Sequence, residues 1–190
     1  GEVFEKSGEG VKWILGASIF SQATRFIFSL FLARLLNPED FGLMAMAILL
    51  TEFIARFNNF GLSAALVQKT DVEEEDLSTT FWFLFAVGIL LCGAALLASP
   101  LVEMFFGQKG LAQLVSINAF GLLIMPVGSL FTAILMRDLN FRAVGIATVV
   151  ASLVPGIVSV VLAYRGFGVL SLAIGGICHV FIFSLIKYAF

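Results

Sequence analysis

Three charged side chains lie deep inside long apolar stretches of the sequence. Arg25 lies near the middle of the first stretch, and Glu52 and Arg56 lie near the middle of the second. If these stretches cross a membrane, each such group costs on the order of 2.5–3.5 kcal/mol at the helix centre on insertion scales. Charged groups at this depth normally face a water-filled cavity or a charged partner, so these three residues are the first candidates for a site.

Each of the two stretches also carries a polar stripe, because polar residues recur at steps of four, three and four positions and therefore share one helical face. The stripes consist of Ser18, Gln22, Arg25 and Ser29 in the first stretch, and of Glu52, Arg56, Asn59 and Ser63 in the second. If the stripes face each other, they form one side of a hydrated cleft. Two arginines against one glutamate leave this cleft cationic, and guanidinium groups bind phosphate through paired hydrogen bonds. The predicted chemistry is therefore the binding of a phosphate-bearing anion.

A purely structural interpretation of the same charges stays open. Glu52 and Arg56 are four positions apart and can neutralise each other as a pair on one helix face. Arg25 would then extend its guanidinium toward the membrane surface or bind backbone carbonyls. His179, the single histidine, also has two interpretations: a proton relay, or the commoner hydrogen bond between helices. The acidic run at 73–76 is interpreted as a solvated helix face rather than as a metal site.

The composition indicates which elements position these residues. Of the 190 residues, 60% are hydrophobic and 13% are charged, and the mean hydropathy is +1.05. A folded soluble domain of this size cannot bury so much apolar surface, because a small globule leaves a large share of its area exposed. This excludes an ordinary cytoplasmic enzyme and a disordered segment, and the net charge of −2 argues against a nucleic-acid partner. A membrane protein remains.

Six apolar stretches are long enough to cross a bilayer, which needs about 20 residues per helix. They predict an all-α, polytopic membrane protein with transmembrane helices at about 11–35, 42–66, 81–102, 111–136, 143–164 and 168–189. Stretches of this length exclude porin-like strands of about ten residues.

Turn chemistry separates the predicted helices. The run Asn37-Pro38-Glu39-Asp40 breaks the chain after the first helix, because proline disfavours helical geometry in the residue before it. Pro100 is expected to end the third helix near Glu103. The segment at 165–168 predicts a tight hairpin before the sixth helix.

The placement of lysine and arginine predicts the orientation of the helices, because these residues accumulate in cytoplasmic joints. With a cytoplasmic N-terminus, the inside joints contain Lys6, Lys12, Lys69, Arg137, Arg142 and Lys187, and the outside joints contain Arg34, Lys109 and Arg165. The excess on the inside favours this orientation. The sequence begins with Gly1 and stops at Phe190 within an apolar run, so we expect a fragment of a longer protein.

Six short segments occur in a recognisable order along the chain. They are ARLLNPEDFGLMAMA (33–47), FNNFGLSAALVQK (57–69), EEDLSTTFWF (74–83), PLVEMFFG (100–107), LMRDLNFR (135–142) and GFGVLSLAIG (166–175). In order and spacing these segments resemble the polysaccharide-transporter family. Its members are the oligosaccharide-lipid flippases of the multidrug/oligosaccharidyl-lipid/polysaccharide (MOP) superfamily.

The resemblance implies a fold of two six-helix lobes, with both termini in the cytoplasm. The whole chain, residues 1–190, resembles the N-terminal lobe, and the second lobe is absent from it. The implied activity is the flipping of isoprenoid-pyrophosphate-linked oligosaccharide repeat units across the inner membrane, by alternating access, for surface polysaccharide biosynthesis. The implied partners are this lipid-linked substrate, membrane lipid and the second lobe.

The resemblance also implies roles for the candidate residues. Arg25 and Arg56 lie at a suitable depth to attract the pyrophosphate. The resemblance carries over to these two arginines only. From the polar stripes themselves, we expect Glu52 to orient Arg56 and limit the net charge, and Gln22, Asn59 and Ser63 to bind phosphate or sugar hydroxyls. Flipping requires no covalent chemistry, so we expect no enzymatic activity, no cofactor and no metal, and the sequence contains no GxxxxGK[ST] nucleotide-binding motif.

Two alternatives stay open. A cation-coupled small-molecule or drug exporter of the same superfamily would use Glu52 as its cleft carboxylate, but an excess of positive charge opposes cationic substrates. A membrane-embedded glycan polymerase or ligase would need a large outside loop with histidine, arginine or aspartate, whereas the predicted outside joints are short.

Overall fold

The computed structural model describes residues 2–56, 74–125, 128 and 141–189, and every secondary-structure element in this part of the chain is a helix. The helices are α1 (Glu2–Leu35), α2 (Pro38–Arg56), α4 (Glu74–Phe106), α5 (Leu111–Ala119), α7 (Phe141–Tyr164) and α8 (Leu170–Ala189). After a turn at Phe120, residues 121–125 are again helical. The predicted all-α class is confirmed.

Three helices in the described part are long and apolar enough to cross a membrane, namely Trp13–Leu35, Ser78–Phe106 and Val144–Tyr164. Two further apolar segments, Leu111–Met125 and Leu170–Ile186, are shorter. The remainders of the predicted helices at 42–66 and 111–136 lie outside the described residues. The chain is therefore a polytopic membrane protein.

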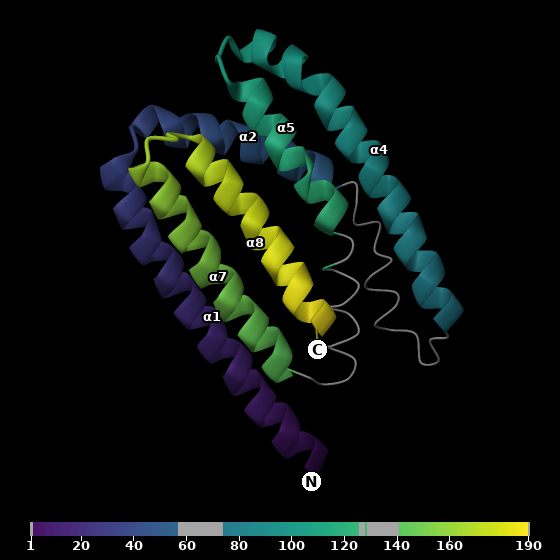
Figure 1. Ribbon diagram of the computed structural model, residues 1–190. Coiled ribbons are helices and arrows are strands. Elements are labelled where there is room, and N and C mark those ends of the chain that lie inside the picture. The colour runs from purple at the N-terminus through teal and green to yellow at the C-terminus, as the bar shows by residue number, and fades with distance from the viewer. Residues whose placement is uncertain (1, 57–73, 126–127, 129–140, 190) are drawn as a thin grey trace.

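The helices form a layered bundle in which neighbours in space are not always neighbours in sequence (Figure 1). Helix α1 packs along α7, and α7 packs along α8, so these three lie side by side. Helix α5 packs between α8 and α2, and α4 covers the other side of α5. The turns between α1 and α2, α4 and α5, and α7 and α8 all lie at the same end of the bundle (Figure 1).

Local chemistry explains two of these turns. Pro38 begins α2, where a missing N–H costs nothing, and the backbone N–H of Asn37 donates to the Asp40 carboxylate over 3.1 Å. Between α7 and α8, Gly166 and Gly168 have φ angles of 84° and 54°. Side chains other than glycine rarely adopt this left-handed geometry, so the tight hairpin depends on these glycines. Both predicted breaks are confirmed.

The prediction that Pro100 ends the third helix is wrong, because α4 continues through Pro100 to Phe106. Proline lacks the N–H that would reach the carbonyl of Leu96, four residues earlier. The hydroxyl of Ser99 donates to that same Leu96 carbonyl over 2.8 Å. The neighbouring side chain thus replaces the missing backbone donor and lets the helix continue.

Small clusters of buried side chains hold the helices together. The clusters are Met44, Ala47, Leu111, Leu114, Val115 and Ala173 between α2, α5 and α8; Cys92, Ala95, Ala119 and Leu122 between α4 and the segment after it; and Leu32, Leu36 and Ala163 between α1 and α7. Close glycine contacts add to them, because a Cβ atom at Gly156 would overlap the Phe28 ring, and one at Gly175 would overlap the Ser159 hydroxyl. Small residues let membrane helices approach closely, and packing rather than the hydrophobic effect then stabilises the pair.

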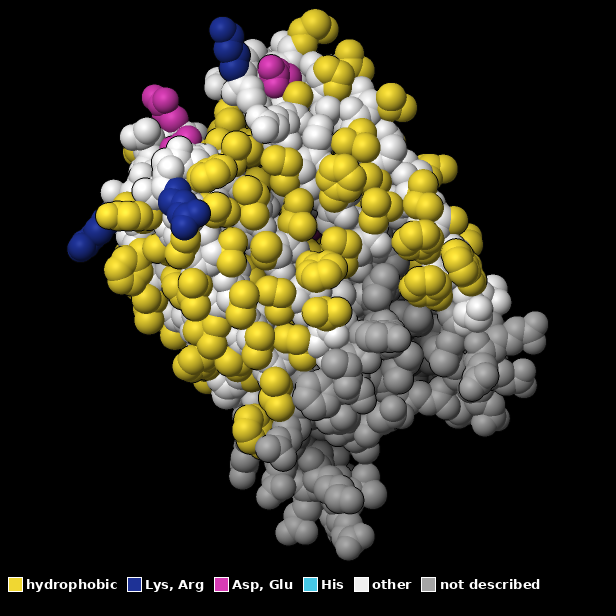
Figure 2. Space-filling model, viewed as in Figure 1, with side chains coloured by type: hydrophobic (Ala, Val, Ile, Leu, Met, Phe, Trp, Pro, Cys, Tyr) yellow, Lys and Arg dark blue, Asp and Glu magenta, His cyan; other side chains and the backbone are white. Residues whose placement is uncertain are grey.

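The outer surface has the character expected of a lipid environment. Large apolar side chains cover the visible flank, whereas the visible charged groups lie at the end where the three turns meet (Figure 2). On α4, for example, Leu90 is 70% exposed and Leu97 is 80% exposed. In water such a surface would promote aggregation, and in a bilayer it contacts hydrocarbon.

Candidate functional site

Arg25 lies near the middle of the apolar part of α1, which runs from Trp13 to Leu35. At 1.5 Å per residue it lies roughly 15–18 Å from either end of this segment, which corresponds to the middle of a bilayer core about 30 Å thick. The residue is exposed, but its guanidinium Nη2 lies 3.5 Å from the imidazole Nε2 of His179 on α8. An arginine side chain only donates hydrogen bonds, so Nε2 of His179 is the acceptor in this contact.

A cavity of about 310 Å³ surrounds this pair. It lies where α1, α7 and α8 meet, and its polar lining consists of Arg25, Ser29, Ser152, Ser159 and His179. Its apolar lining consists of Phe28, Leu32, Phe41, Ala151, Pro155, Gly156 and Leu172. The cavity thus offers one cationic side chain and several hydroxyls within an apolar frame.

The hydroxyls of two lining serines donate hydrogen bonds to backbone carbonyls of their own helices. Ser29 donates to the Phe26 carbonyl over 2.7 Å, and Ser152 donates to the Val149 carbonyl over 2.8 Å. Their oxygens can still accept hydrogen bonds. Arg25 is therefore the strongest donor that an anion entering this cavity would meet, because its five N–H groups carry a full positive charge.

His179 is the residue that reasoning from sequence did not include in the site. Its ring stacks on Phe183, with the ring centroids 5.9 Å apart and an angle of 14° between the planes. The contact with Arg25 joins residues that are 154 positions apart in the sequence, so no local sequence pattern predicts it. In the sequence, the sign that His179 belongs to the site is that it is a single histidine inside an apolar stretch. Of the two interpretations of His179, the structure favours a hydrogen bond between helices.

The second predicted stripe is placed differently from the first. Glu52 and Arg56 lie in the last turns of α2, and both are exposed. Helix α2 packs on α5, whereas α1 packs on α7, and among the described residues neither Glu52 nor Arg56 lines the Arg25 cavity. Of α2, Phe41 alone borders that cavity in the described part of the chain.

The remaining predicted site residues divide into two groups. Gln22 lies one turn before Arg25 on the exposed side of α1. Asn59 and Ser63 lie outside the described residues. The structure therefore brings Arg25 together with Ser29 and with His179, and the grouping of Arg25 with the second stripe stays a prediction.

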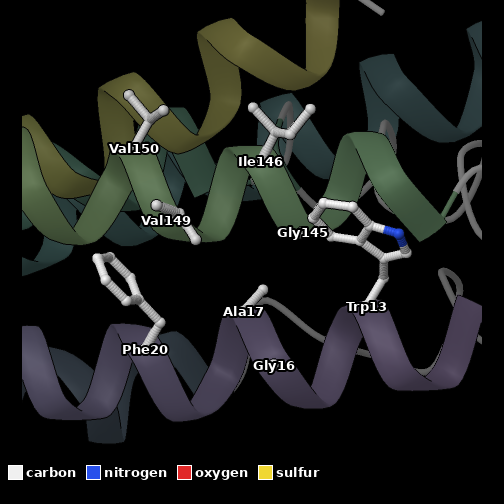
Figure 3. A pocket seen from close by; sticks show the side chains of 8 residues that line it. All are labelled: Trp13, Gly16, Ala17, Phe20, Gly145, Ile146, Val149 and Val150. Atoms are coloured by element: carbon white, nitrogen blue, oxygen red, sulfur yellow. The ribbon is translucent and has the colours of Figure 1, made fainter.

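A larger, apolar groove of about 580 Å³ lies farther toward the N-terminus between the same two helices, α1 and α7 (Figure 3). Its lining consists of Trp13, Gly16, Ala17, Phe20, Gly145, Ile146, Val149 and Val150. The rings of Trp13 and Phe20 rise from α1 toward α7, with Gly16 and Ala17 between them. None of these eight described lining residues is charged, so they offer contacts to a hydrocarbon ligand but none that would recognise a charged headgroup.

Comparison with known proteins gives one family. The family model described as "Polysaccharide biosynthesis protein" matches residues 31–190. This range includes the second stripe and His179 but begins after Gln22 and Arg25.

Several curated proteins are similar to the chain. It is 28% identical over 178 residues to the succinoglycan biosynthesis transport protein ExoT of Rhizobium meliloti (strain 1021), which covers 93% of this chain and 35% of that protein. It is 25% identical over 141 residues to the lipopolysaccharide biosynthesis protein WzxC of Escherichia coli (strain K12), covering 74% of this chain and 29% of that protein. It is 26% identical over 133 residues to the teichuronic acid biosynthesis protein TuaB of Bacillus subtilis (strain 168), covering 70% of this chain and 28% of that protein.

These matches cover only part of each relative, since the chain spans about a third of their length. No solved structure matches the chain with significance. The printed names of the relatives concern the biosynthesis or transport of surface polymers, and ExoT is named as a transport protein.

Proposed function

Because the chain belongs to the polysaccharide biosynthesis protein family, we propose that it is part of a transporter that flips isoprenoid-pyrophosphate-linked oligosaccharide repeat units across the inner membrane. Its relatives are named for the biosynthesis or transport of surface polymers. In this proposal residues 1–190 form an N-terminal lobe with a cytoplasmic N-terminus, and a second lobe closes the transport path. Flipping breaks no covalent bond, so the proposed activity needs no catalytic residue and no cofactor.

The observation that carries this proposal is the exposed guanidinium of Arg25 at the middle of an apolar helix, beside a cavity with a polar lining. A cation at this depth is costly in lipid and is stabilised by water or by an anion. A pyrophosphate group would neutralise this cation, and its phosphate oxygens accept paired hydrogen bonds from a guanidinium.

In the structure, His179 accepts a hydrogen bond from one of the N–H groups of Arg25. A neutral imidazole can be displaced by a phosphate oxygen, which is the stronger acceptor because it is charged. His179 would thus keep Arg25 pointing into the cavity until the headgroup arrives. This positioning role adds one residue to the site expected from the sequence.

The other predicted residues complete the proposed path. Arg56 on α2 would provide the second cation, and Glu52 one turn away would orient it. Gln22, Asn59 and Ser63 would bind phosphate or sugar hydroxyls as the lobes rock against each other and open the site to alternate sides of the membrane. Of these residues, Gln22, Glu52 and Arg56 are exposed in the structure, as contact with a hydrated path requires.

The test is a pair of substitutions, Arg25→Gln and Arg56→Gln, made singly in the native full-length protein. Surface polysaccharide is quantified in a host that depends on the transporter, at matched abundance in the membrane. A hydrogen bond to a charged group contributes about 1.5–3 kcal/mol, so we expect each variant to lose about tenfold or more of its transport.

Arg34→Gln is the matched control, because Arg34 is exposed in the last turn of the same helix as Arg25 but lies near the membrane surface. It should leave the amount of polymer unchanged. Normal polymer in the Arg25→Gln variant would overturn the assignment of Arg25 to headgroup binding, and the family match alone would then support the function.

A further inference from the structure

The atom of His179 that contacts Arg25 is also an atom that can bind a proton. The guanidinium Nη2 of Arg25 lies 3.5 Å from Nε2 of His179, and the guanidinium is the donor. The lone pair of Nε2 that accepts this hydrogen bond is the same lone pair that a proton would occupy. Arg25 and a proton therefore compete for one position on His179.

The charges in the cavity favour Arg25 in this competition. Arg25 is the one charged group among the described residues that line the cavity, and these residues include no carboxylate. A proton on His179 would place a second positive charge next to the first, without an opposite charge to balance the two. While Arg25 points at His179, the imidazole is therefore neutral, and its Nε2 carries no proton.

The helices packed around His179 add no charge to the described lining of the cavity. Helix α8 packs on α7 and on α5. Helix α5 contains no charged or titratable residue, and α7 contains such residues only in its first and last turns. The titratable residues of α7 and α8 besides His179 are Arg142 and Tyr164 on α7, and Cys178, Lys187 and Tyr188 on α8. None of them is among the described lining residues, so Arg25 is the charged group there that faces the imidazole.

A diphosphate in this cavity would reverse the balance of charge. In a lipid-linked saccharide the diphosphate is esterified at both ends, so each phosphate carries one negative charge. Arg25 alone would leave one of these charges uncompensated at membrane depth, which is costly. A proton on His179 would bring the sum to zero. Glu52 and Arg56 are not among the described lining residues, and their opposite charges cancel in this sum.

We propose that His179 is a proton-binding site that is filled together with the headgroup site. The anion draws the guanidinium of Arg25 toward its own oxygens, which frees the lone pair of Nε2. Nε2 then binds one proton from water, and the resulting N–H donates to a phosphate oxygen. No covalent bond of the lipid changes. This inference rests on the proposed function, because it concerns the same headgroup, and it makes His179 a second cationic donor in the cavity.

The test measures proton uptake by the native full-length protein in lipid nanodiscs. The probe is farnesyl diphosphate esterified with one hexose, because each of its phosphates has a single, strongly acidic oxygen and keeps its charge between about pH 5 and pH 8, where histidine titrates. Isothermal titration calorimetry in two buffers of different ionisation enthalpy gives the number of protons taken up per bound probe. Near neutral pH we expect this uptake to approach one proton. The affinity should rise by about tenfold when the pH is lowered from about 8 to about 6.

His179→Gln separates proton binding from hydrogen bonding. The amide oxygen of glutamine accepts a hydrogen bond from Arg25 but binds no proton in this range of pH. Proton uptake and the pH dependence of the affinity should therefore both disappear. Cys178→Ser is the matched control, because Cys178 precedes His179 on α8 but is not among the described lining residues. Proton uptake should be unchanged in this variant, and both variants should elute as monodisperse protein.

Nitrogen NMR of the wild-type protein, with its histidines labelled, gives a measurement that does not depend on the folding of a variant. The nitrogen chemical shifts distinguish a neutral imidazole from an imidazolium. At a pH of about 7, addition of the probe should convert one histidine from the neutral to the doubly protonated form. If no histidine changes its charge when the probe binds, the inference is wrong.

Three outcomes separate this inference from the proposed function. Binding of the probe without proton uptake, or an uptake that persists in His179→Gln, would overturn the inference and leave the proposed function standing. A wild-type protein that does not bind the probe would also overturn the inference. The transport assay of Arg25→Gln then decides the proposed function separately, because a loss of polymer supports it and unchanged polymer means that both fail.

Discussion

The guanidinium Nη2 of Arg25 lies 3.5 Å from the imidazole Nε2 of His179. This contact joins the middle of the apolar part of α1 to α8, across a cavity whose third wall is α7. Because arginine only donates, the contact requires Nε2 to carry no proton. An anion that binds Arg25 must therefore compete with His179, so these two side chains form one unit rather than two independent sites.

The first prediction concerns the energetic coupling of Arg25 and His179. His179→Phe keeps a ring that can stack on Phe183 but removes the acceptor, so the guanidinium is left unpaired. We expect the free energy of unfolding in mixed detergent micelles to fall by about 1–3 kcal/mol. In an Arg25→Gln background the same change should cost less than half as much, because no guanidinium then needs the acceptor. Additive costs in this double-mutant cycle would show that the contact contributes nothing.

The second prediction concerns the packing of Gly156 on α7 against Phe28 on α1. A Cβ atom at position 156 would overlap the aromatic ring, so Gly156→Ala should lower the free energy of unfolding by about 1–3 kcal/mol. Replacing the ring by Phe28→Ala should make the alanine at 156 tolerable, and the double variant should be more stable than the sum of the single changes predicts. Gly16→Ala is the control on the facing helix, since a Cβ there meets nothing within 4 Å. Equal losses for Gly16→Ala and Gly156→Ala would contradict this explanation.

Features that depend on neighbouring residues were predictable from the sequence. The break at 37–40 follows from the chemistry of Pro38 and Asp40, and the hairpin at 165–168 follows from its two glycines. The mid-depth position of Arg25 needs only the length of the apolar stretch around it. In each case the signal lies in the residues around the feature, so predicting it needs no knowledge of contacts with distant parts of the chain.

Features that depend on helix packing were not predictable in the same way. Periodicity within a helix does not say which helix it packs against, and in the structure α1 packs along α7, where small residues allow a close approach. The packing of α1 on α7, and of α7 on α8, places His179 beside Arg25. The periodicity within a single helix contains no information about this contact. The wrong prediction that the helix ends at Pro100 has a local cause. The general rule that proline breaks a helix leaves out the hydrogen bond that the Ser99 hydroxyl donates in place of the missing N–H.

The third prediction concerns this replacement of a backbone donor by Ser99. Ser99→Ala removes the hydrogen bond to the Leu96 carbonyl, which Pro100 cannot restore. We expect a loss of about 0.5–1.5 kcal/mol in the free energy of unfolding. In a Pro100→Ala background the new N–H can bond to Leu96, so the cost of Ser99→Ala should shrink.

The hydroxyl of Ser116 also donates to the Ser99 hydroxyl, over 3.1 Å. That contact is lost in both backgrounds and therefore cancels when the two costs of Ser99→Ala are compared. If Ser99→Ala costs the same with and without proline at position 100, the explanation for the uninterrupted helix is incorrect.

The fourth prediction concerns the start of α5. Gly110, the residue before this helix, has no side chain to cap it, and the Glu103 carboxylate at the end of α4 accepts the backbone N–H of Ala112 over 2.9 Å. A negative charge at a helix N-terminus also interacts favourably with the helix dipole. We expect Glu103→Ala to cost about 0.5–2 kcal/mol of unfolding free energy, as the loss of a helix cap does. Glu103→Gln keeps an oxygen acceptor and loses only the charge, so its cost should be smaller. Lys109→Ala, in the same turn, controls for the loss of a charge alone, and an equal loss in all three variants would rule out capping by Glu103.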